Sequence, residues 1–265
     1  MTVHPDTAAL MANSAAIDEC DVTVVGGAGH VGIPLVLALA EAGLRVNVND
    51  RNRATLDMLR AGELPFIENG AQEALKRALL AGRLAFTDSP HRISRRGPVI
   101  ITIGTPIDEF FNPIRKVIQD CVDAILPSLA DGQLVVLRST TFPGTTEWLA
   151  SYLRTKARDL LVAFCPERIV QGDGMKELRE LPQIVSGTTP EAESEAVKLF
   201  TRIAPEVVVV SPMEAEFAKL FTNAYRYIEF AVTNEFYLVA KSAGIDYQRV
   251  LQAMKHNYPR LKGCL

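Results

Sequence analysis

Cysteine is scarce in this sequence and is poorly spaced for two of its common uses. The 265 residues include four cysteines, Cys20, Cys121, Cys165 and Cys264, and no two of them form a C-x-x-C pair. This spacing argues against a zinc ribbon and against a dithiol redox pair. Few, scattered cysteines are typical of a reducing compartment, so the sequence predicts a cytoplasmic protein.

The sequence also lacks an excess of charge of either sign. Its net charge is −3 at pH 7, which gives no reason to expect nucleic acid or an acidic membrane as a partner. Residues 1–19 contain no apolar run long enough for a signal peptide or a membrane span, and acidic side chains interrupt them. We therefore expect a flexible extension over 1–19, followed by a globular chain without internal repeats.

A glycine-rich stretch follows the first predicted strand. Residues 21–25 (DVTVV) form a β-branched run typical of a buried parallel strand. Gly27, Gly29 and Gly32 come next in G-x-G-x-x-G spacing, and the apolar residues after them predict a helix that ends near Gly43. The glycines alone are a weak signal, but strand, turn and helix in this order are typical of a dinucleotide-binding fold.

The chemistry of a dinucleotide accounts for these residue types. Gly27 permits a tight turn, Gly29 lets the backbone approach a pyrophosphate, and Gly32 lets the helix pack against the strand. Asp50 ends a second predicted strand, 18 residues beyond Gly32, near the spacing of a carboxylate that binds a ribose 2′-hydroxyl. A carboxylate repels a 2′-phosphate, so we predict NAD as the cofactor. Arg51, next to it, keeps NADP open as the alternative.

The pattern of strands and helices continues to about residue 211. Strands are predicted at 84–87, 98–103, 133–137, 160–164, 183–186 and 207–211, and helices around 70–81, 115–129, 144–157 and 190–203. Strands rich in Val and Ile that alternate with helices indicate a doubly wound parallel sheet. The sequence thus predicts an α/β fold, with a Rossmann-like NAD-binding domain over 20–211.

A different pattern follows this domain. Residues 213–243 contain neither Pro nor Gly, and their apolar residues fall at helical spacing, which predicts one long helix that ends at Gly244. A shorter helix is predicted near 247–256. We expect 212–265 to form a helical central domain whose long helix makes a homodimer interface, although packing within one subunit is the simpler alternative.

Several polar residues could contribute chemistry. Thr105 and Thr140 each follow a predicted strand, at the edge where open α/β sheets bind ligands; helix capping and a strand exit are the structural alternatives. Lys219, Asn223 and Arg226 share one face of the long helix. A buried lysine on a largely apolar helix is costly unless it is paired or catalytic, and Glu167 is a candidate partner for Lys219. The alternative is that the Lys219 side chain extends into solvent.

These stretches together resemble a known family, the UDP-glucose/GDP-mannose dehydrogenases, which are nucleotide-sugar 6-dehydrogenases. The resemblance runs from about residue 20 to the C-terminus. It rests on GGAGHVG (26–32), Asp50, ELPFIENG (63–70), ITIGTP (101–106), RSTTFPGTT (138–146), CPERIVQG (165–172), PQIVSG (182–187), KLFTNAYR (219–226) and YPRL (258–261). The CPER form is similar to the branch that acts on UDP-N-acetyl-mannosamine and related sugars.

The resemblance implies an activity and roles for particular residues. Family members oxidise a sugar C6 alcohol to a carboxylate with two NAD, through a thiohemiacetal on a catalytic cysteine. By this resemblance Lys219 and Asn223 stabilise the oxyanion, and Glu167 and Thr105 lie at the reacting centre. The implied NAD contacts are Gly27, Gly29, His30, Val31, Gly32, Asp50, Arg51, Thr105 and Thr140. The implied UDP-sugar contacts are Glu167, Arg168, Ile169, Lys219, Asn223, Arg226, Tyr258 and Arg260. No metal is implied.

The sequence departs from the family pattern in ways that bear on activity. The glycine-rich segment that holds the catalytic cysteine is absent, as is the C-terminal UDP-binding domain, and Cys264 does not match that cysteine. Gln171 replaces the second Glu of the UDP-glucose branch, and Tyr258 stands where this branch often has His. We therefore expect the central domain to be truncated and this chain alone to be inactive.

Two other readings stay open. One is a β-hydroxyacid dehydrogenase of the 6-phosphogluconate type, which has a similar length and also uses a Lys-x-x-x-Asn pair. The other is a non-catalytic NAD-binding scaffold, favoured by the missing cysteine segment. Activity on a small 3-hydroxyacid, with no UDP-sugar binding, would favour the first, whereas the intact pair Lys219 and Asn223 argues against the second.

Overall fold

A computed structural model of the protein describes residues 16–110, 112–156 and 158–258. The chain divides into two compact units, Met1–Phe217 and Ala218–Leu265. We describe each unit by itself.

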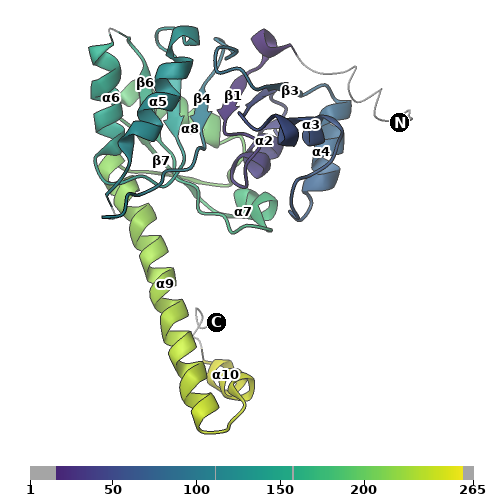
Figure 1. Ribbon diagram of the computed structural model, residues 1–265, viewed down its shortest axis with the longest axis vertical. Coiled ribbons are helices and arrows are strands. Elements are labelled where there is room, and N and C mark those ends of the chain that lie inside the picture. The colour runs from purple at the N-terminus through teal and green to yellow at the C-terminus, as the bar shows by residue number, and fades with distance from the viewer. Residues whose placement is uncertain (1–15, 111, 157, 259–265) are drawn as a thin grey trace. The chain divides into compact units, whose positions relative to one another are not determined.

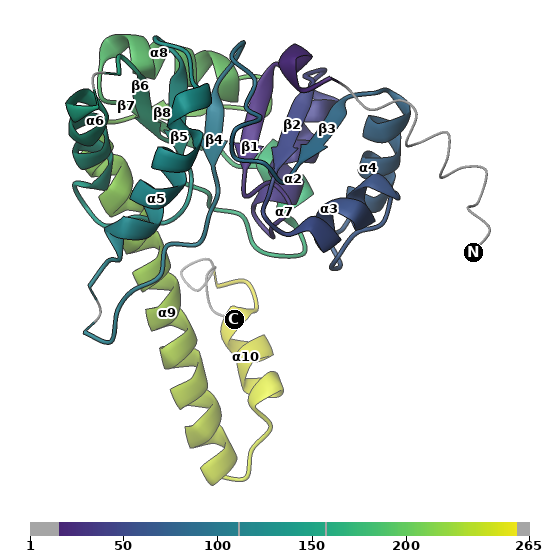
Figure 2. The ribbon, with the colours of Figure 1, turned by 45° about the horizontal axis from the view of Figure 1, so that its top comes forward.

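The first unit is built on one eight-stranded sheet (Figures 1 and 2). Its strand order is β3-β2-β1-β4-β5-β6-β7-β8, in which β1 and β4 are neighbours and the order reverses between them. The strands are β1 (Val22–Val25), β2 (Val46–Asn49), β3 (Leu84–Thr87), β4 (Val99–Ile101), β5 (Leu134–Leu137), β6 (Leu161–Phe164), β7 (Gln183–Gly187) and β8 (Val207–Val209). The crevice at such a reversal is where doubly wound folds bind their ligands.

The central strands are apolar because helices cover both faces of the sheet (Figure 2). Every residue of β1, β2, β4 and β5 is buried. The helices of this unit are α2 (Gly32–Glu41), α3 (Arg53–Arg60), α4 (Ala71–Leu80), α5 (Arg115–Ile125), α6 (Thr145–Thr155), α7 (Gly174–Glu180) and α8 (Pro190–Phe200), with short 3-10 turns η1 (Ile17–Glu19) and η2 (Leu126–Ser128). Helix α2 packs on α4 and α7, and α8 packs on β5, β6 and β7.

The predicted α/β fold is confirmed, with one difference in strand direction. Strands β1 to β6 are parallel, but β7 runs antiparallel to β6, and β8 is parallel to β7. The connection from β6 to β7 contains only the short helix α7, which leads back to the same edge of the sheet. The sheet is therefore mostly parallel, with two reversed strands at one side.

Two helices were not predicted from the sequence. Helix α3 has eight residues and begins where the Asn52 side chain accepts a hydrogen bond from the Thr55 N–H at 3.2 Å. Helix α7 has seven residues, and its start is held by a residue far away in the sequence, described below. Short helices that depend on such contacts carry too little periodicity to be predicted.

A flexible extension was predicted over 1–19. Residues 1–15 lie outside the described residues, and Ile17–Glu19 form η1. The Ile17 side chain is buried in a small cluster with Cys20 and Ala85. Residues 17–19 therefore belong to the folded unit.

The second unit contains most of helix α9 (Pro212–Ser242) and all of α10 (Tyr247–Lys255), close to the predicted bounds of both helices. Gly244, at φ +70°, turns the chain between them, and Asp246 caps α10 by accepting from Gln248 N–H at 2.8 Å. Ala240, Tyr247 and Leu251 form the small core of this helix pair. No helix among the described residues is long and apolar enough to cross a membrane.

Candidate dinucleotide-binding site

The glycine-rich loop connects β1 to α2, beside the point where the strand order reverses. A Cβ atom on Gly32 would lie 2.4 Å from the carbonyl oxygen of Gly26, and one on Gly27 would lie 2.8 Å from that of Val24. Both positions therefore need glycine for packing. A Cβ on Gly29 would meet only the Gly26 oxygen, at 3.5 Å, so this position is open on its outer side. The absence of a side chain at Gly29 leaves room for a ligand to approach the backbone.

Asp50 lies directly beside this loop. Its Oδ2 accepts a hydrogen bond from the Ala28 N–H at 3.1 Å, and its Oδ1 accepts from the Asn52 N–H at 2.9 Å. The neighbouring Arg51 is exposed, and Arg53 forms an ion pair with Asp88. The carboxylate is thus placed at the end of β2 next to the glycines, as the ribose contact requires.

The loops after β4 and β5 meet at the same edge of the sheet. The Thr105 hydroxyl donates to the carbonyl oxygen of Thr140, and the Ser139 hydroxyl donates to that of Ile103. The structure therefore brings together the two threonines that the sequence singled out. They line a recess of about 260 Å³, open to solvent, together with residues from the start of α5 and of α6.

Thr141 in this recess is a candidate that sequence reasoning did not single out. Its side chain is 3% exposed, and its hydroxyl has no hydrogen-bond partner among the described residues. A buried hydroxyl without a partner is costly unless a ligand or water completes it. With the open position at Gly29 and the carboxylate of Asp50, this orphan hydroxyl fits a site for a dinucleotide.

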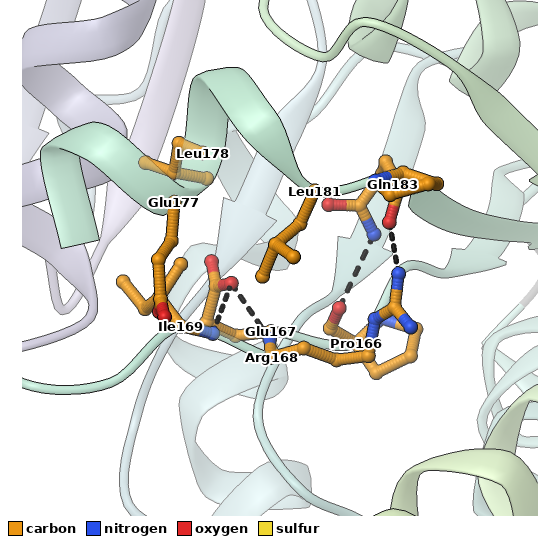
Figure 3. Close-up of a pocket in the computed structure, with 9 residues that line it drawn as sticks. Pro166, Glu167, Arg168, Ile169, Glu177, Leu178, Leu181 and Gln183 are labelled. Carbon is orange, nitrogen blue, oxygen red and sulfur yellow. Dashed lines mark hydrogen bonds between the residues drawn. The ribbon is translucent and has the colours of Figure 1, made fainter. Parts of the chain in front are cut away.

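The segment 165–175, which carries CPERIVQG, leads from the end of β6 to α7. Carboxylates bind its backbone N–H groups in place of regular secondary structure. Glu167 Oε1 accepts from the N–H of Arg168 at 2.7 Å and from that of Ile169 at 3.0 Å (Figure 3). Glu177 accepts from the N–H of Val170. A recess of about 210 Å³ lies between this segment and the chain around Leu181 and Gln183.

Glu167 has a partner that the sequence did not indicate. Its Oε2 forms an ion pair with Arg138, whose side chain is fully buried, while that of Glu167 is 9% exposed. The Arg138 guanidinium also donates to Gln183 Oε1 at 3.0 Å and to the Cys165 carbonyl at 3.1 Å, and it lies over the ring of Phe200. Glu167 therefore balances a buried cation, in addition to any role toward a ligand.

The far end of the segment meets two other motifs. His30, from the glycine-rich loop, has its Nδ1 3.0 Å from Gln171 Nε2, and its ring centroid is 3.9 Å from that of Phe66. Glu68, from ELPFIENG, accepts from Gly172 N–H at 2.9 Å and from Met175 N–H at 3.1 Å, which holds the start of α7. Three separate motifs of the sequence are thus in contact in the fold.

Helix α6 is capped in an unexpected way. Capping by hydroxyl residues of RSTTFPGTT was the structural alternative to a ligand contact, but the N-cap is Gly144, at φ +83°, with no side-chain bond of its own. The fully buried carboxylate of Glu216, from the start of α9, accepts from Gly144 N–H at 2.6 Å and from Thr146 N–H at 2.8 Å. These bonds explain why the first turns of α9 belong to the first unit.

The remaining predicted residues lie in the second unit. Lys219 and Asn223 are half-buried on α9, one turn apart, and Arg226 lies over the ring of Phe230. Tyr258 is exposed. Arg260 lies outside the described residues, as does Cys264.

None of the described cysteines suits the role of a nucleophile. Burial raises the pKa of Cys20 and of Cys165 to about 12 and that of Cys121 to about 11, so all three are protonated thiols near neutral pH. No group of His, Cys, Asp or Glu side chains suited to a metal ion occurs in the described parts of the chain.

The strand order and the glycine-rich loop define an α/β dinucleotide-binding protein. Residues 20–204 match the NAD binding domain of the UDP-glucose/GDP-mannose dehydrogenase family, and residues 213–262 match its central domain. The chain belongs to this family, which confirms the resemblance and the predicted cofactor and decides against the β-hydroxyacid dehydrogenase alternative.

Known relatives cover most of this chain. UDP-N-acetyl-D-mannosamine dehydrogenase of Salmonella typhimurium is 28% identical over 248 residues, which are 89% of this chain and 58% of that protein. NDP-N-acetyl-D-galactosaminuronic acid dehydrogenase of Ralstonia nicotianae is 29% identical, over 92% of this chain and 60% of that protein. The structure of UDP-D-ManNAc dehydrogenase from Pyrococcus horikoshii superposes with a TM-score of 0.81 at 28% identity, over 89% of this chain and 58% of that one. The chain thus spans less than two thirds of these relatives.

Proposed function

We propose that this chain carries the cofactor-binding part of an NAD-dependent nucleotide-sugar 6-dehydrogenase. One observation carries the cofactor assignment: the open backbone at Gly29 lies beside the carboxylate of Asp50 at the reversal of the strand order. A carboxylate next to the loop suits the two free hydroxyls of the NAD ribose and repels the 2′-phosphate of NADP. The names of the relatives support a UDP-N-acetyl sugar, of the mannosamine type, as substrate.

The chain's own residues suggest how it would hold the reactants. The N–H groups of His30 and Val31 would bind the pyrophosphate at the start of α2. Thr105, Thr140 and the orphan hydroxyl of Thr141 would bind the cofactor where the loops after β4 and β5 meet. When bound, NAD accepts a hydride from the sugar C6. These contacts fix the orientation of the cofactor.

We propose distinct roles for the polar residues outside these cofactor contacts. The ammonium group of Lys219, assisted by Asn223, would stabilise the oxyanion that forms at C6. Glu167 would hold the backbone of Arg168 and Ile169, which are predicted substrate contacts, while it balances Arg138. Arg226, Tyr258 and Arg260 remain proposed contacts of the nucleotide sugar.

The function is tested by NAD binding and by turnover. We expect calorimetry to show tighter binding of NAD than of NADP. In a version of the chain extended to include the family's cysteine segment, NADH formation with UDP-N-acetyl-mannosamine should depend on Lys219, with NAD affinity unchanged in Lys219→Ala. NAD binding by that extended chain without any NADH formation, for this sugar or for UDP-glucose, would instead favour the non-catalytic scaffold. Preference for NADP would overturn the assignment of Asp50.

The exposed apolar residues of α9 support a homodimer as part of the proposal. Tyr227 is 74% exposed and Ile228 is 61% exposed, and further aromatic and aliphatic residues along the helix are also exposed. Apolar surface of this extent is typical of an interface. A self-associated state should appear in sedimentation velocity and should be lost in Ile228→Asp. Leu80→Asp, at a 63% exposed leucine of the first unit, is the matched control. The cytoplasmic location stays a prediction.

A further inference from the structure

The contact between His30 and Gln171 joins two parts of the molecule that have separate tasks. His30 lies in the glycine-rich loop, whose backbone is the proposed pyrophosphate site. Gln171 lies 141 residues further on, in the segment that carries Glu167, Arg168 and Ile169. The two side chains meet at 3.0 Å between His30 Nδ1 and Gln171 Nε2.

The His30 ring is held on a second side. Its centroid lies 3.9 Å from that of Phe66, with the planes at 35°. Phe66 belongs to the same loop as Asn69, whose N–H donates to the Gly172 carbonyl at 2.9 Å and whose side chain donates to Asp173 at 2.9 Å. The imidazole is therefore packed against one loop and hydrogen-bonded to the next.

The segment 165–175 depends on such side-chain contacts for its shape. Carboxylates of Glu167, Glu177 and Glu68 accept the N–H groups of residues 168, 169, 170, 172 and 175. A segment with few backbone ladder bonds opens more readily than a strand or a helix. A change in any contact that holds it will alter how well it is ordered.

We propose that His30 and Gln171 are positioning residues through which NAD binding orders the segment 165–175. The inference rests on the proposed function. A pyrophosphate bound to the N–H groups of His30 and Val31 fixes the loop backbone and therefore the direction of the His30 ring. The fixed ring holds Gln171 and Phe66, and through them the segment with the predicted substrate contacts. By thermodynamic linkage, an ordered segment also favours the bound cofactor.

Hydrogen exchange measured by mass spectrometry tests this coupling on the full chain. The segment is followed with and without saturating NAD, in the wild type and in Gln171→Leu, which keeps a side chain of similar bulk and removes the hydrogen bond. We expect NAD to slow exchange in residues 165–173 of the wild type by about fivefold, the lower end of typical coupling between sites, and to have little effect in the variant. Gln252→Leu, at an exposed glutamine of α10, is the control and should behave as the wild type.

His30→Phe and the double variant separate coupling from general loss of structure. Phenylalanine can keep the contact with Phe66 but has no ring nitrogen. A purely structural defect speeds exchange equally with and without NAD, whereas lost coupling removes the difference between the two. We expect each single variant to lose this difference and the double variant to lose no more, because both remove the same bond.

The other outcomes are equally informative. If NAD slows exchange in the variants as much as in the wild type, the hydrogen bond does not carry the coupling and the inference is wrong. If NAD binds the wild type but leaves exchange in 165–173 unchanged, the inference is wrong while the cofactor assignment stands. If calorimetry finds no NAD binding to the wild type, the proposed function itself fails, and the inference fails with it.

Discussion

The carboxylate of Glu216 accepts hydrogen bonds from both the backbone N–H and the hydroxyl of Thr146, 70 residues earlier in the chain. It thereby caps helix α6 from the first turn of α9, with no exposure to solvent. A buried carboxylate at a helix N-terminus satisfies N–H groups that would otherwise have no partner, and it interacts favourably with the helix dipole.

Glu216→Ala should therefore destabilise the protein. The variant leaves the N–H groups of Gly144 and Thr146 buried without an acceptor, which we expect to cost about 2–3 kcal/mol of the free energy of unfolding. Urea denaturation measures this cost. Glu214→Ala removes an exposed carboxylate near the start of the same helix, which accepts from the N–H and the hydroxyl of Ser211, and should change stability much less than Glu216→Ala does. Equal effects of the two variants would contradict the capping role.

Asp50→Ala should weaken NAD binding. The variant removes a charge-assisted hydrogen bond to the ribose, which corresponds to about 1.5–3 kcal/mol of binding free energy. Isothermal titration calorimetry with NAD measures the loss. Asp57→Ala, at an exposed carboxylate of α3 that pairs with Arg60, is the control and should bind as the wild type. Unchanged affinity in Asp50→Ala would remove the ribose contact from this residue.

Glu167→Gln should lower the stability of the folded protein. The substitution keeps the shape of the side chain but leaves the guanidinium of Arg138, which is fully buried, without its counter-charge. Breaking one side of a buried ion pair costs about 3–5 kcal/mol when the partner is truncated, and we expect a smaller loss for the isosteric amide. Thermal unfolding without any ligand tests this. An unchanged melting temperature would show that the ion pair with Arg138 does not stabilise the fold.

The buried cysteines should resist alkylation in the folded protein. The pKa of Cys165 is raised to about 12 from its ordinary value of 9.0 by burial, so the reactive thiolate is rare at about pH 8. Iodoacetamide followed by mass spectrometry should leave Cys20 and Cys165 unmodified until denaturant is added. Rapid labelling of Cys165 in native protein would contradict its burial.

The same pKa shifts fix the sign of a pH effect on stability. The folded state holds the proton of these thiols more tightly than the unfolded state does. The thiols therefore do not change the free energy of unfolding below about pH 9. They lower it as the pH rises from 9 toward 12, because in that range the unfolded chain releases the thiol protons while the folded protein still holds them. Replacement of Cys165 by alanine should reduce that loss in urea denaturation above pH 9.

Local patterns in the sequence were sufficient to predict the strands, the long helix and the glycine-rich loop. Gly32 and Asp50 could be assigned because strand, turn and acid follow one another within one βαβ unit. The buried position of Arg138 could not be predicted, because the residues next to it in the sequence do not indicate its partners. Those partners lie 27, 29 and 45 residues later in the chain. Glu216 and Glu68 were missed for the same reason, since each caps a helix from a distant part of the chain.

The bonds of Glu68 also set an order of events during folding. Its acceptor oxygens bind N–H groups 104 and 107 positions later in the chain, at Gly172 and Met175. Closing a loop of this length costs more chain entropy than pairing β1 with β2, so this contact should form after the neighbouring strands have assembled. During synthesis, β1, β2 and β3 all leave the ribosome before the partners of Glu68 exist. We therefore expect the Glu68 carboxylate to remain hydrated until α7 forms. Its bonds to Gly172 and Met175 then fix the loop that precedes α4.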